Sequence, residues 1–310
     1  MRPHTSTRAF TLIEMMIVIG IIGLLISISM TALISVHKQG YKVGEKNNIR
    51  QLGNAWLKYS QIHREKIAPA WLSPNTQSKW ETELVYPDGT TISPAPTYGS
   101  DQPNVAGPWT WRLLPYMEND LRLIRGNRDS PPINQWDVVT EDMKLDIAQT
   151  PEFGLNGYFL GGVWDRWYGD IRKNHPRFVR VEDVDERKVN LVSKSLSLMK
   201  HPSRVIGFIS NASGEPGRIG TPLDSDPGHW LATPHRLGDE IQWRLNASLD
   251  LEMAEGQSAP IGRHGGPTVT WHPDGHVDGF TMSELLDQRL WIDRANDEIG
   301  DRGSGYLYTE

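Results

Sequence analysis

The sequence FTLIEMMIVIGIIGLLISISMTALISV, residues 10–36, is the most distinctive stretch of this chain of 310 residues. It carries a single charge, Glu14, and the 22 residues from Met15 to Val36 contain no Asp, Glu, Lys or Arg. As an α-helix, these 22 residues would extend roughly 33 Å, close to the thickness of the hydrocarbon core of a bilayer. The stretch is therefore a candidate membrane-spanning helix.

The rest of the chain has the composition of a soluble protein. Mean hydropathy is −0.48 and hydrophobic residues make up 38% of the chain, so one membrane pass is the limit. A net charge of −6 gives no basic footprint for nucleic acid. The lack of cysteine excludes disulfides, Cys-ligated zinc and thiol catalysis. The 12 Trp, 29 Gly and 21 Pro predict a loop-rich, β-containing head.

The first nine residues, MRPHTSTRA, are short, polar and basic, with Arg2 and Arg8 and no acid. A secretory signal peptide would continue with an apolar core of about 7 to 15 residues, which is shorter than the run found here. A plain signal anchor is a second alternative. Neither alternative explains Glu14, because an ionisable group in a membrane helix is costly and usually has a partner. Glu14 is therefore a candidate functional residue.

The run from Ala9 to Glu14, AFTLIE, resembles the prepilin processing signature of type IV pilins and type II secretion pseudopilins. This resemblance implies that a prepilin peptidase cuts between Ala9 and Phe10 and that the new amine of Phe10 is methylated. It also implies that Glu14 pairs with the N-terminal ammonium of a neighbouring subunit in a filament. The family prefers Gly immediately before the cut, where this chain has Ala9.

The helix is expected to continue beyond Val36 as an amphipathic segment. Apolar residues recur there at steps of three and four and predict a stripe that packs on the head, namely Ile49, Leu52, Trp56, Tyr59 and Ile62. Pro69 and Pro74 are expected to mark the end of this helix. The predicted parts are a leader, a transmembrane half, an amphipathic half and a globular head, at residues 1–9, 10–36, 37–66 and 67–310.

Four other segments of the head carry predictions. A hairpin is expected at Pro87-Asp88-Gly89 and a short helix at 138–148. A tail helix is expected with Ser283 as its N-cap. Acidic residues at Asp183, Asp185 and Glu186 invite a calcium interpretation, but a solvated segment is favoured because the EF-hand spacing is missing.

The segment from Arg263 to Phe280 predicts a β-hairpin. Val269 and Trp271 alternate with polar residues, and Pro273-Asp274-Gly275 supplies a tight turn, because Pro presets φ and Gly accepts a positive φ.

His264, followed after nine residues by Asp274-Gly275, resembles the C-terminal signature of a large prepilin-type family known mainly from planctomycete bacteria. The runs Trp111 to Tyr116, Asn156 to Tyr158 and His201 to Ser203 also resemble that family. The resemblance implies a pilin-like architecture and little chemistry.

A metal site is an alternative for the polar residues around this turn. Imidazole and carboxylate ligands suit zinc or another transition metal, and the candidates are His264, His272, His276 and Asp278. Turn chemistry explains Asp274, and a hydrogen bond bracing the hairpin explains His264. The sequence therefore favours a structural role over a bound divalent cation, and a cation over catalysis. No cofactor is expected.

These patterns predict an α+β, pilin-like protein, with a long N-terminal spine helix and a head built on an antiparallel β-sheet. The expected function is that of a structural subunit of a type IV pilus-like or type II secretion pseudopilus-like filament, and not of an enzyme. The expected partners are prepilin peptidase, copies of itself or other pilin-like subunits, and a membrane, without nucleic acid. The expected location is the inner membrane with the head in the periplasm, or an extracellular filament after assembly. The alternative is a membrane-anchored binding or hydrolytic head that uses the prepilin export route, with its site at residues 264–278.

Overall fold

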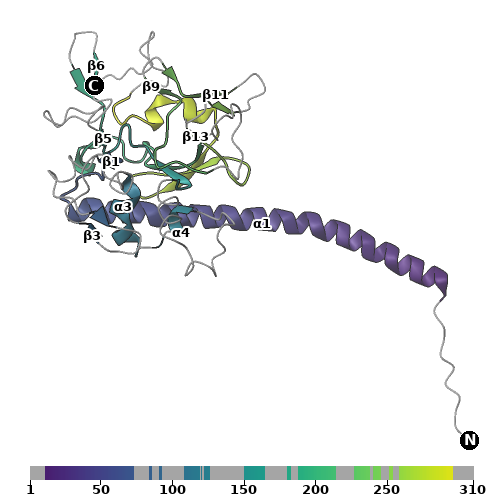
Figure 1. Ribbon diagram of the computed structural model, residues 1–310. Helices are drawn as coiled ribbons and strands as arrows, with labels where there is room; N and C mark the ends of the chain where they lie inside the picture. The colour runs from purple at the N-terminus through teal and green to yellow at the C-terminus, as the bar shows by residue number, and fades with distance from the viewer. Residues whose placement is uncertain are drawn as a thin grey trace, which may run out of the picture. The chain divides into compact units, whose positions relative to one another are not determined.

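The computed structural model describes residues 11–72, 84–85, 91–92, 108–118, 120, 122–125, 150–164, 180–182, 188–213, 227–237, 240–245, 251–253 and 258–295. The chain divides into two compact units, Met1–Val43 and Gly44–Glu310. A helix of 51 residues, α1 (Leu12–Ile62), runs through the boundary between them (Figure 1). The predicted α+β class is confirmed, because this helix is joined to a head with an antiparallel sheet.

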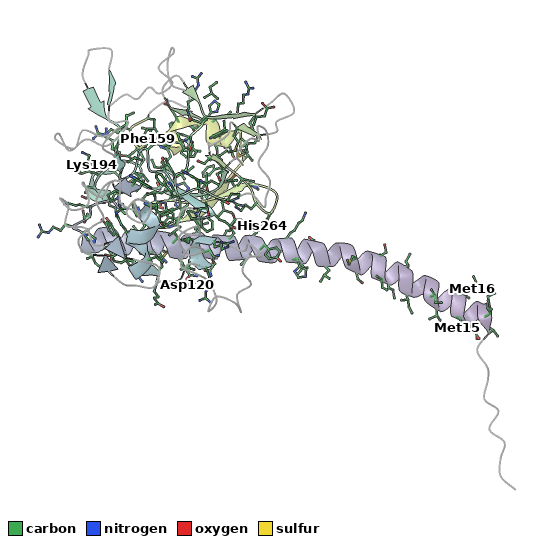
Figure 2. All side chains as sticks on the ribbon, in the orientation of Figure 1. Met15, Met16, Asp120, Phe159, Lys194 and His264 are labelled. Carbon is green, nitrogen blue, oxygen red and sulfur yellow. The ribbon has the colours of Figure 1, made fainter. Side chains whose placement is uncertain are left out.

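The first unit consists, in its described part, of Thr11 and the residues of α1 from Leu12 to Val43. The most apolar part of α1 has none of its residues buried. Figure 2 shows the side chains of Met15 and Met16 projecting from this end of the helix. By length and composition, α1 is the one helix among the described residues that could cross a membrane. A signal sequence can share both of these properties.

In the second unit, α1 buries the predicted apolar stripe with one exception. Ile49, Leu52, Trp56 and Tyr59 are buried, whereas Ile62 is 68% exposed. At 3.6 residues per turn, Ile62 lies about 100° around the helix from the mean direction of the other four residues. Its inclusion in the packed stripe was therefore wrong.

Helix α1 ends earlier than the predicted residue 66. It stops at Ile62, after which Arg64 and Glu65 adopt the left-handed conformation, with φ of 56° and 62°. The backbone N–H of Glu65 then donates to the carbonyl of Ser60 at 2.7 Å, which closes the C-terminus of the helix. The end is set by this local closure and not by Pro69.

Five strands form the central sheet of the head: β4 (Phe153–Leu155), β8 (Phe208–Ser213), β13 (Ser258–Pro260), β14 (Thr268–Trp271) and β15 (Val277–Phe280). All of their pairings are antiparallel. Strand β8 is central, because Ile209 pairs with Gly154 of β4 and also with Thr270 of β14. Strand β13 pairs with the second half of β8, and β15 pairs with β14.

The described residues also form short strand pairs: β1 (Trp71–Leu72) with β5 (Val163–Trp164), β2 (Leu84–Val85) with β3 (Thr91–Ile92), β6 (Arg180–Glu182) with β7 (Lys188–Asn190), β9 (Arg236–Leu237) with β10 (Glu240–Ile241), and β11 (Trp243–Leu245) with β12 (Leu251–Met253). The β1–β5 pair is parallel and the others are antiparallel. The short helices are α3 (Trp109–Leu113), α4 (Arg122–Arg125), η1 (Leu114–Met117), η4 (Leu196–Leu198), η5 (Glu284–Leu286) and η6 (Gln288–Leu290).

Several sequence predictions fall on segments that the structure does not describe. The β2–β3 pair flanks the predicted turn at Pro87-Asp88-Gly89, but the turn residues themselves lie outside the described residues. The same holds for the predicted helix at 138–148 and for the acidic residues at 183–186.

The core of the head is rich in tryptophan. Five of its largest fully buried side chains are Trp56, Trp109, Trp243, Trp271 and Trp291. One core cluster joins α1 to the central sheet, where the rings of Trp56 and Trp271 meet edge to face with centroids 5.4 Å apart. A second cluster holds the C-terminal segment around Trp291 against the sheet. Packing of these aromatic rings therefore fixes the head on the helix.

Candidate functional site

Helix α1 begins with a reciprocal hydrogen-bond arrangement between Thr11 and Glu14. The backbone N–H and the hydroxyl of Thr11 both donate to Oε2 of Glu14 at 2.9 Å. The backbone N–H of Glu14 in turn donates to the Thr11 hydroxyl at 3.3 Å. This is a capping box, in which a Thr before the helix and a Glu three residues later satisfy each other's exposed N–H groups.

The capping box gives the only charge of the apolar stretch a role within its own chain. The Glu14 carboxylate already accepts two hydrogen bonds, so part of the cost of placing it among apolar residues is offset without a neighbouring subunit. The spacing Thr-x-x-Glu is the sequence signal for this arrangement, which adds a partner within the chain to the intermolecular partner predicted for Glu14. The predicted processing residues, Ala9 and Phe10, lie outside the described residues.

The second candidate region is the hairpin of β14 and β15, which the structure confirms. The backbone N–H of Gly275 donates to the His272 carbonyl at 2.8 Å, and that of His272 donates to the His276 carbonyl at 3.0 Å. Gly275 has a φ of +98°, a conformation that side-chain-bearing residues rarely adopt. The predicted Pro-Asp-Gly turn therefore forms for the expected reason.

His272 is a structural residue of this hairpin. It is 1% exposed, and its Nδ1 lies 2.9 Å from the Val205 carbonyl. Because a carbonyl can only accept, Nδ1 carries the proton, and Nε2 accepts from the Thr270 hydroxyl at 3.2 Å. Burial, followed by the nearby charge of His276, lowers the pKa of His272 from 6.5 to about 4. The ring is therefore neutral at pH 7.

His276 and Asp274 form an exposed pair at the tip of the hairpin. Nδ1 of His276 lies 2.5 Å from Oδ1 of Asp274, which also accepts the backbone N–H of His276 at 3.2 Å. Burial opposes ionisation of Asp274, but these hydrogen bonds outweigh it and hold the pKa of the carboxyl below its ordinary value. The ring of His276 stacks on that of His272 with centroids 4.2 Å apart.

The predicted metal candidates do not converge. Among the described residues, no group of three or more His, Cys, Asp or Glu side chains is arranged to hold a metal ion. Both ring nitrogens of His272 face protein groups, and Oδ1 of Asp278 accepts the backbone N–H of Gly279 at 2.8 Å. His264 precedes β14 in a turn closed by a bond from the Gly265 N–H to the Gly262 carbonyl. The geometry therefore does not support the cation site considered at His264, His272, His276 and Asp278.

Asn156, which belongs to the second resemblance, and Asp293, which does not, both have structural roles. The side-chain amide of Asn156, which is fully buried, donates to the carbonyls of Ile206 at 3.0 Å and Trp291 at 2.8 Å. The buried carboxylate of Asp293 accepts the backbone N–H groups of Lys200 and His201, at 2.9 and 2.7 Å. These two side chains tie the C-terminal segment to the rest of the head.

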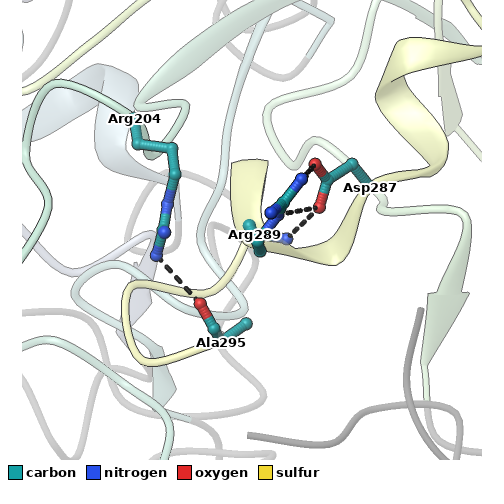
Figure 3. Close-up of polar contacts among 4 residues, drawn as sticks. All are labelled: Arg204, Asp287, Arg289 and Ala295. Atoms are coloured by element: carbon teal, nitrogen blue, oxygen red, sulfur yellow. Dashed lines mark hydrogen bonds and ion pairs between the residues drawn. The ribbon is translucent and has the colours of Figure 1, made fainter. Parts of the chain in front are cut away.

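Charged side chains reinforce the same segment, as Figure 3 shows. The guanidinium of Arg204 donates to the carbonyl of Ala295 at 3.0 Å, and that of Arg289 donates to the Asp287 carboxylate at 2.8 Å. Asp287 also accepts the backbone N–H of Arg289 at 2.8 Å and so caps η6. The roles of Arg204 and Asp293 could not be predicted from sequence, because their partners lie about 90 residues away and leave no local pattern.

The predicted tail helix differs from the structure. The region forms two short 3₁₀ helices, η5 and η6, and Ser283 makes no side-chain cap. The capping residue is Thr281, whose N–H and hydroxyl donate to Glu284 at 2.7 and 2.8 Å. The Thr-x-x-Glu spacing of Thr11 and Glu14 thus occurs a second time.

The start of α1, with Glu14 in its first turn, lies within the part of the chain that resembles known proteins. The family model described as the prokaryotic N-terminal methylation motif matches residues 5–30. No curated protein and no solved structure matches the chain. The matched residues include Ala9, Phe10 and Glu14, and they identify a prepilin-type N-terminus of the kind that type IV pilin-like proteins carry. The match does not reach the C-terminal run from His264 to Gly275.

Proposed function

We propose that this protein is a structural subunit of a type IV pilus-like or type II secretion pseudopilus-like filament. In this proposal, prepilin peptidase cuts between Ala9 and Phe10, and the subunit assembles through α1. The observation that carries the proposal is the methylation motif at residues 5–30, which coincides with a long helix whose apolar side chains are exposed.

The exposed apolar surface of the first unit supports assembly through the helix. Leu12, Ile19 and Leu24 are 79%, 63% and 63% exposed, and each large apolar side chain left in water forgoes about 1.5 to 3 kcal/mol of burial. Lipid first covers this surface, and the helices of other subunits replace the lipid on assembly. If the helices pack through two different surfaces and the subunits do not close into a ring, each added subunit extends the assembly into a filament.

Glu14 sets the register in this proposal. A carboxylate in an apolar environment favours arrangements that bring a cation beside it, because the unpaired charge is costly. The ammonium of a neighbouring Phe10 would supply that cation, in addition to the Thr11 hydrogen bonds that already exist.

We further propose that the head has no catalytic role. In support, His272 and Asp274 serve the hairpin, and the capping carboxylate of Glu284 serves η5.

The mass of the membrane-extracted protein tests the processing step. We expect the N-terminus at a methylated Phe10, with the first nine residues absent. An intact Met1, or an N-terminus near Thr31 as a signal peptidase would leave, would contradict the proposal. Ala9→Gly is the matched variant, because it restores the residue that the prepilin family prefers before the cut, and we expect it to be processed at least as completely as the wild type.

Substitutions at Glu14 test the assembly step. Glu14→Ala should leave membrane insertion intact and abolish incorporation into filaments. Glu14→Gln keeps an acceptor for Thr11 but removes the charge, so it separates capping from charge pairing. If Glu14→Gln assembles as the wild type does, the carboxylate serves only as a cap and the register role is wrong.

Protease treatment tests the proposed location. With the head in the periplasm, protease added to spheroplasts should degrade the head, and protection of the head would contradict this orientation.

Metal analysis tests the alternative of a binding or hydrolytic head. Stoichiometric metal that is lost in His264→Ala would favour that alternative over a purely structural subunit.

A further inference from the structure

Two lysines follow the apolar stretch directly on α1. Lys38 and Lys42 stand one helical turn apart, after 22 residues without a charged side chain. Within the part of the chain that the structure describes, neither ammonium group belongs to an ion pair. The only acid in residues 1–43 is Glu14, which lies about 36 Å from Lys38 along a helix. The first unit therefore offers these lysines no counterion.

An aromatic pair occupies the same two turns. Tyr41 lies between the lysines and is 42% exposed, and its ring centroid is 6.5 Å from that of His37. Tyrosine is enriched at membrane–water interfaces because it combines an apolar ring with a polar hydroxyl. Lysine suits the same level, since its apolar stem can lie along lipid while its ammonium reaches the headgroups.

We propose that His37, Lys38, Tyr41 and Lys42, here named the juxtamembrane collar, bind the anionic phosphate headgroups of phospholipids. The 22 uncharged residues span roughly 33 Å against a hydrocarbon core of about 30 Å, which places the collar at the headgroup level. The collar holds the subunit at a fixed depth in the leaflet where α1 leaves the membrane. The inference rests on the membrane-spanning part of the proposed function and does not require filament assembly.

A phospholipid is a better occupant than a second copy of this unit. Another copy inserted at the same depth offers Glu14 as its only acid in residues 1–43, and that acid lies at the opposite end of the span. Phospholipid phosphates, in contrast, are present at the level of the collar wherever the helix crosses a bilayer. Each lysine near the surface raises the affinity for anionic lipid by up to about fivefold, and salt screens this electrostatic attraction.

The test uses the full chain reconstituted in vesicles of phosphatidylcholine, with spin-labelled phosphatidylglycerol or phosphatidylcholine as the probe. Electron paramagnetic resonance then measures the preference of the protein's boundary for the anionic probe. We expect a clear preference for phosphatidylglycerol that falls with salt. It should disappear when Lys38→Gln and Lys42→Gln are combined, and it should persist when Lys38→Arg and Lys42→Arg are combined.

The matched control is Lys58→Gln, which removes an exposed lysine from the head portion of the same helix and should leave the preference unchanged. The proposal would be overturned if the Lys38→Gln, Lys42→Gln double variant kept the wild-type preference for phosphatidylglycerol. It would also be overturned if Lys58→Gln lost as much of that preference as the double variant does. If the chain inserts into vesicles but shows no anionic preference, the collar alone is wrong. If the chain does not insert at all, the collar and the membrane-spanning part of the proposed function are both wrong.

Discussion

The backbone of Gly53 lies directly against the indole ring of Trp271. A Cβ atom at position 53 would be 2.0 Å from Cε2 of that ring, closer than any side chain can approach. On the strand side, a Cβ atom at Gly207 would be 2.6 Å from Cε3 of the same ring. Trp271 of β14 therefore fits a slot that two glycines leave open, one on α1 and one before β8.

Gly53→Ala should destabilise the head by about 1 to 3 kcal/mol, because the indole ring must move and its neighbours are tightly packed. This cost exceeds the gain of about 0.5 to 1 kcal/mol from replacing glycine inside a helix. Denaturant unfolding of the full chain, followed by tryptophan fluorescence, measures the change. Gly40→Ala is the control, since a Cβ there meets nothing within 4 Å. Equal stability of the two variants would contradict the slot.

His272 should make the stability of the head depend on pH. Its pKa falls from 6.5 in the unfolded chain to about 4 in the fold, so between these values the unfolded chain binds a proton that the folded chain does not. The contribution of His272 to the free energy of unfolding is therefore greatest above pH 6.5. It decreases as the pH falls from 6.5 to about 4 and levels off below that value. Between pH 6.5 and about pH 4, the titration of His272 lowers the free energy of unfolding by about 3 kcal/mol.

His272→Gln should reduce this slope, which unfolding measurements at several pH values would detect. It should not remove the slope, because burial also lowers the pKa of His229 and His235. His201→Gln is the comparison, since it removes a histidine outside the hairpin. A slope in His272→Gln that equals the slope of the wild type would show that this ring is not held neutral by the fold.

Asn156→Ala should cost about 2 to 4 kcal/mol, because it leaves the buried carbonyls of Ile206 and Trp291 without a donor. Hydrogen exchange and limited proteolysis should show that the segment around Trp291 loosens first. Asp278→Asn, at an exposed position of β15, should change stability by less than about 0.5 kcal/mol. A global loss of protection without preferential opening near Trp291 would argue against this bridging role.

Gly275→Ala should destabilise the hairpin by about 1 to 2 kcal/mol, since φ of +98° is strained for any residue with a Cβ. A Cβ at this position meets nothing within 4 Å, so the cost is conformational and not steric. Gly275→Asn should cost less than Gly275→Ala, because asparagine tolerates positive φ better. Thermal unfolding of the three proteins gives the order, and the reverse order would contradict a backbone origin.

Features governed by neighbours in sequence were predictable. The apolar run gave the start of α1, and the Pro-Asp-Gly turn gave the β14–β15 hairpin, because periodicity and turn chemistry act over a few residues. The errors at Ile62 and Ser283 were also local. The angular position of Ile62 and the Thr-x-x-Glu spacing of Thr281 and Glu284 are both properties of neighbouring residues in the sequence.

The linear order of residues was sufficient to specify an apolar helix with one carboxylate, a prepilin-type N-terminus and a turn that needs glycine. The roles of His272, Asn156 and Trp271 emerged only on folding, since their partners are remote in the chain. Val205 lies 67 residues from His272, and Trp291 lies 135 residues from Asn156. Imidazole and amide groups can bind ligands or brace a core, and burial beside a particular carbonyl selects between these roles.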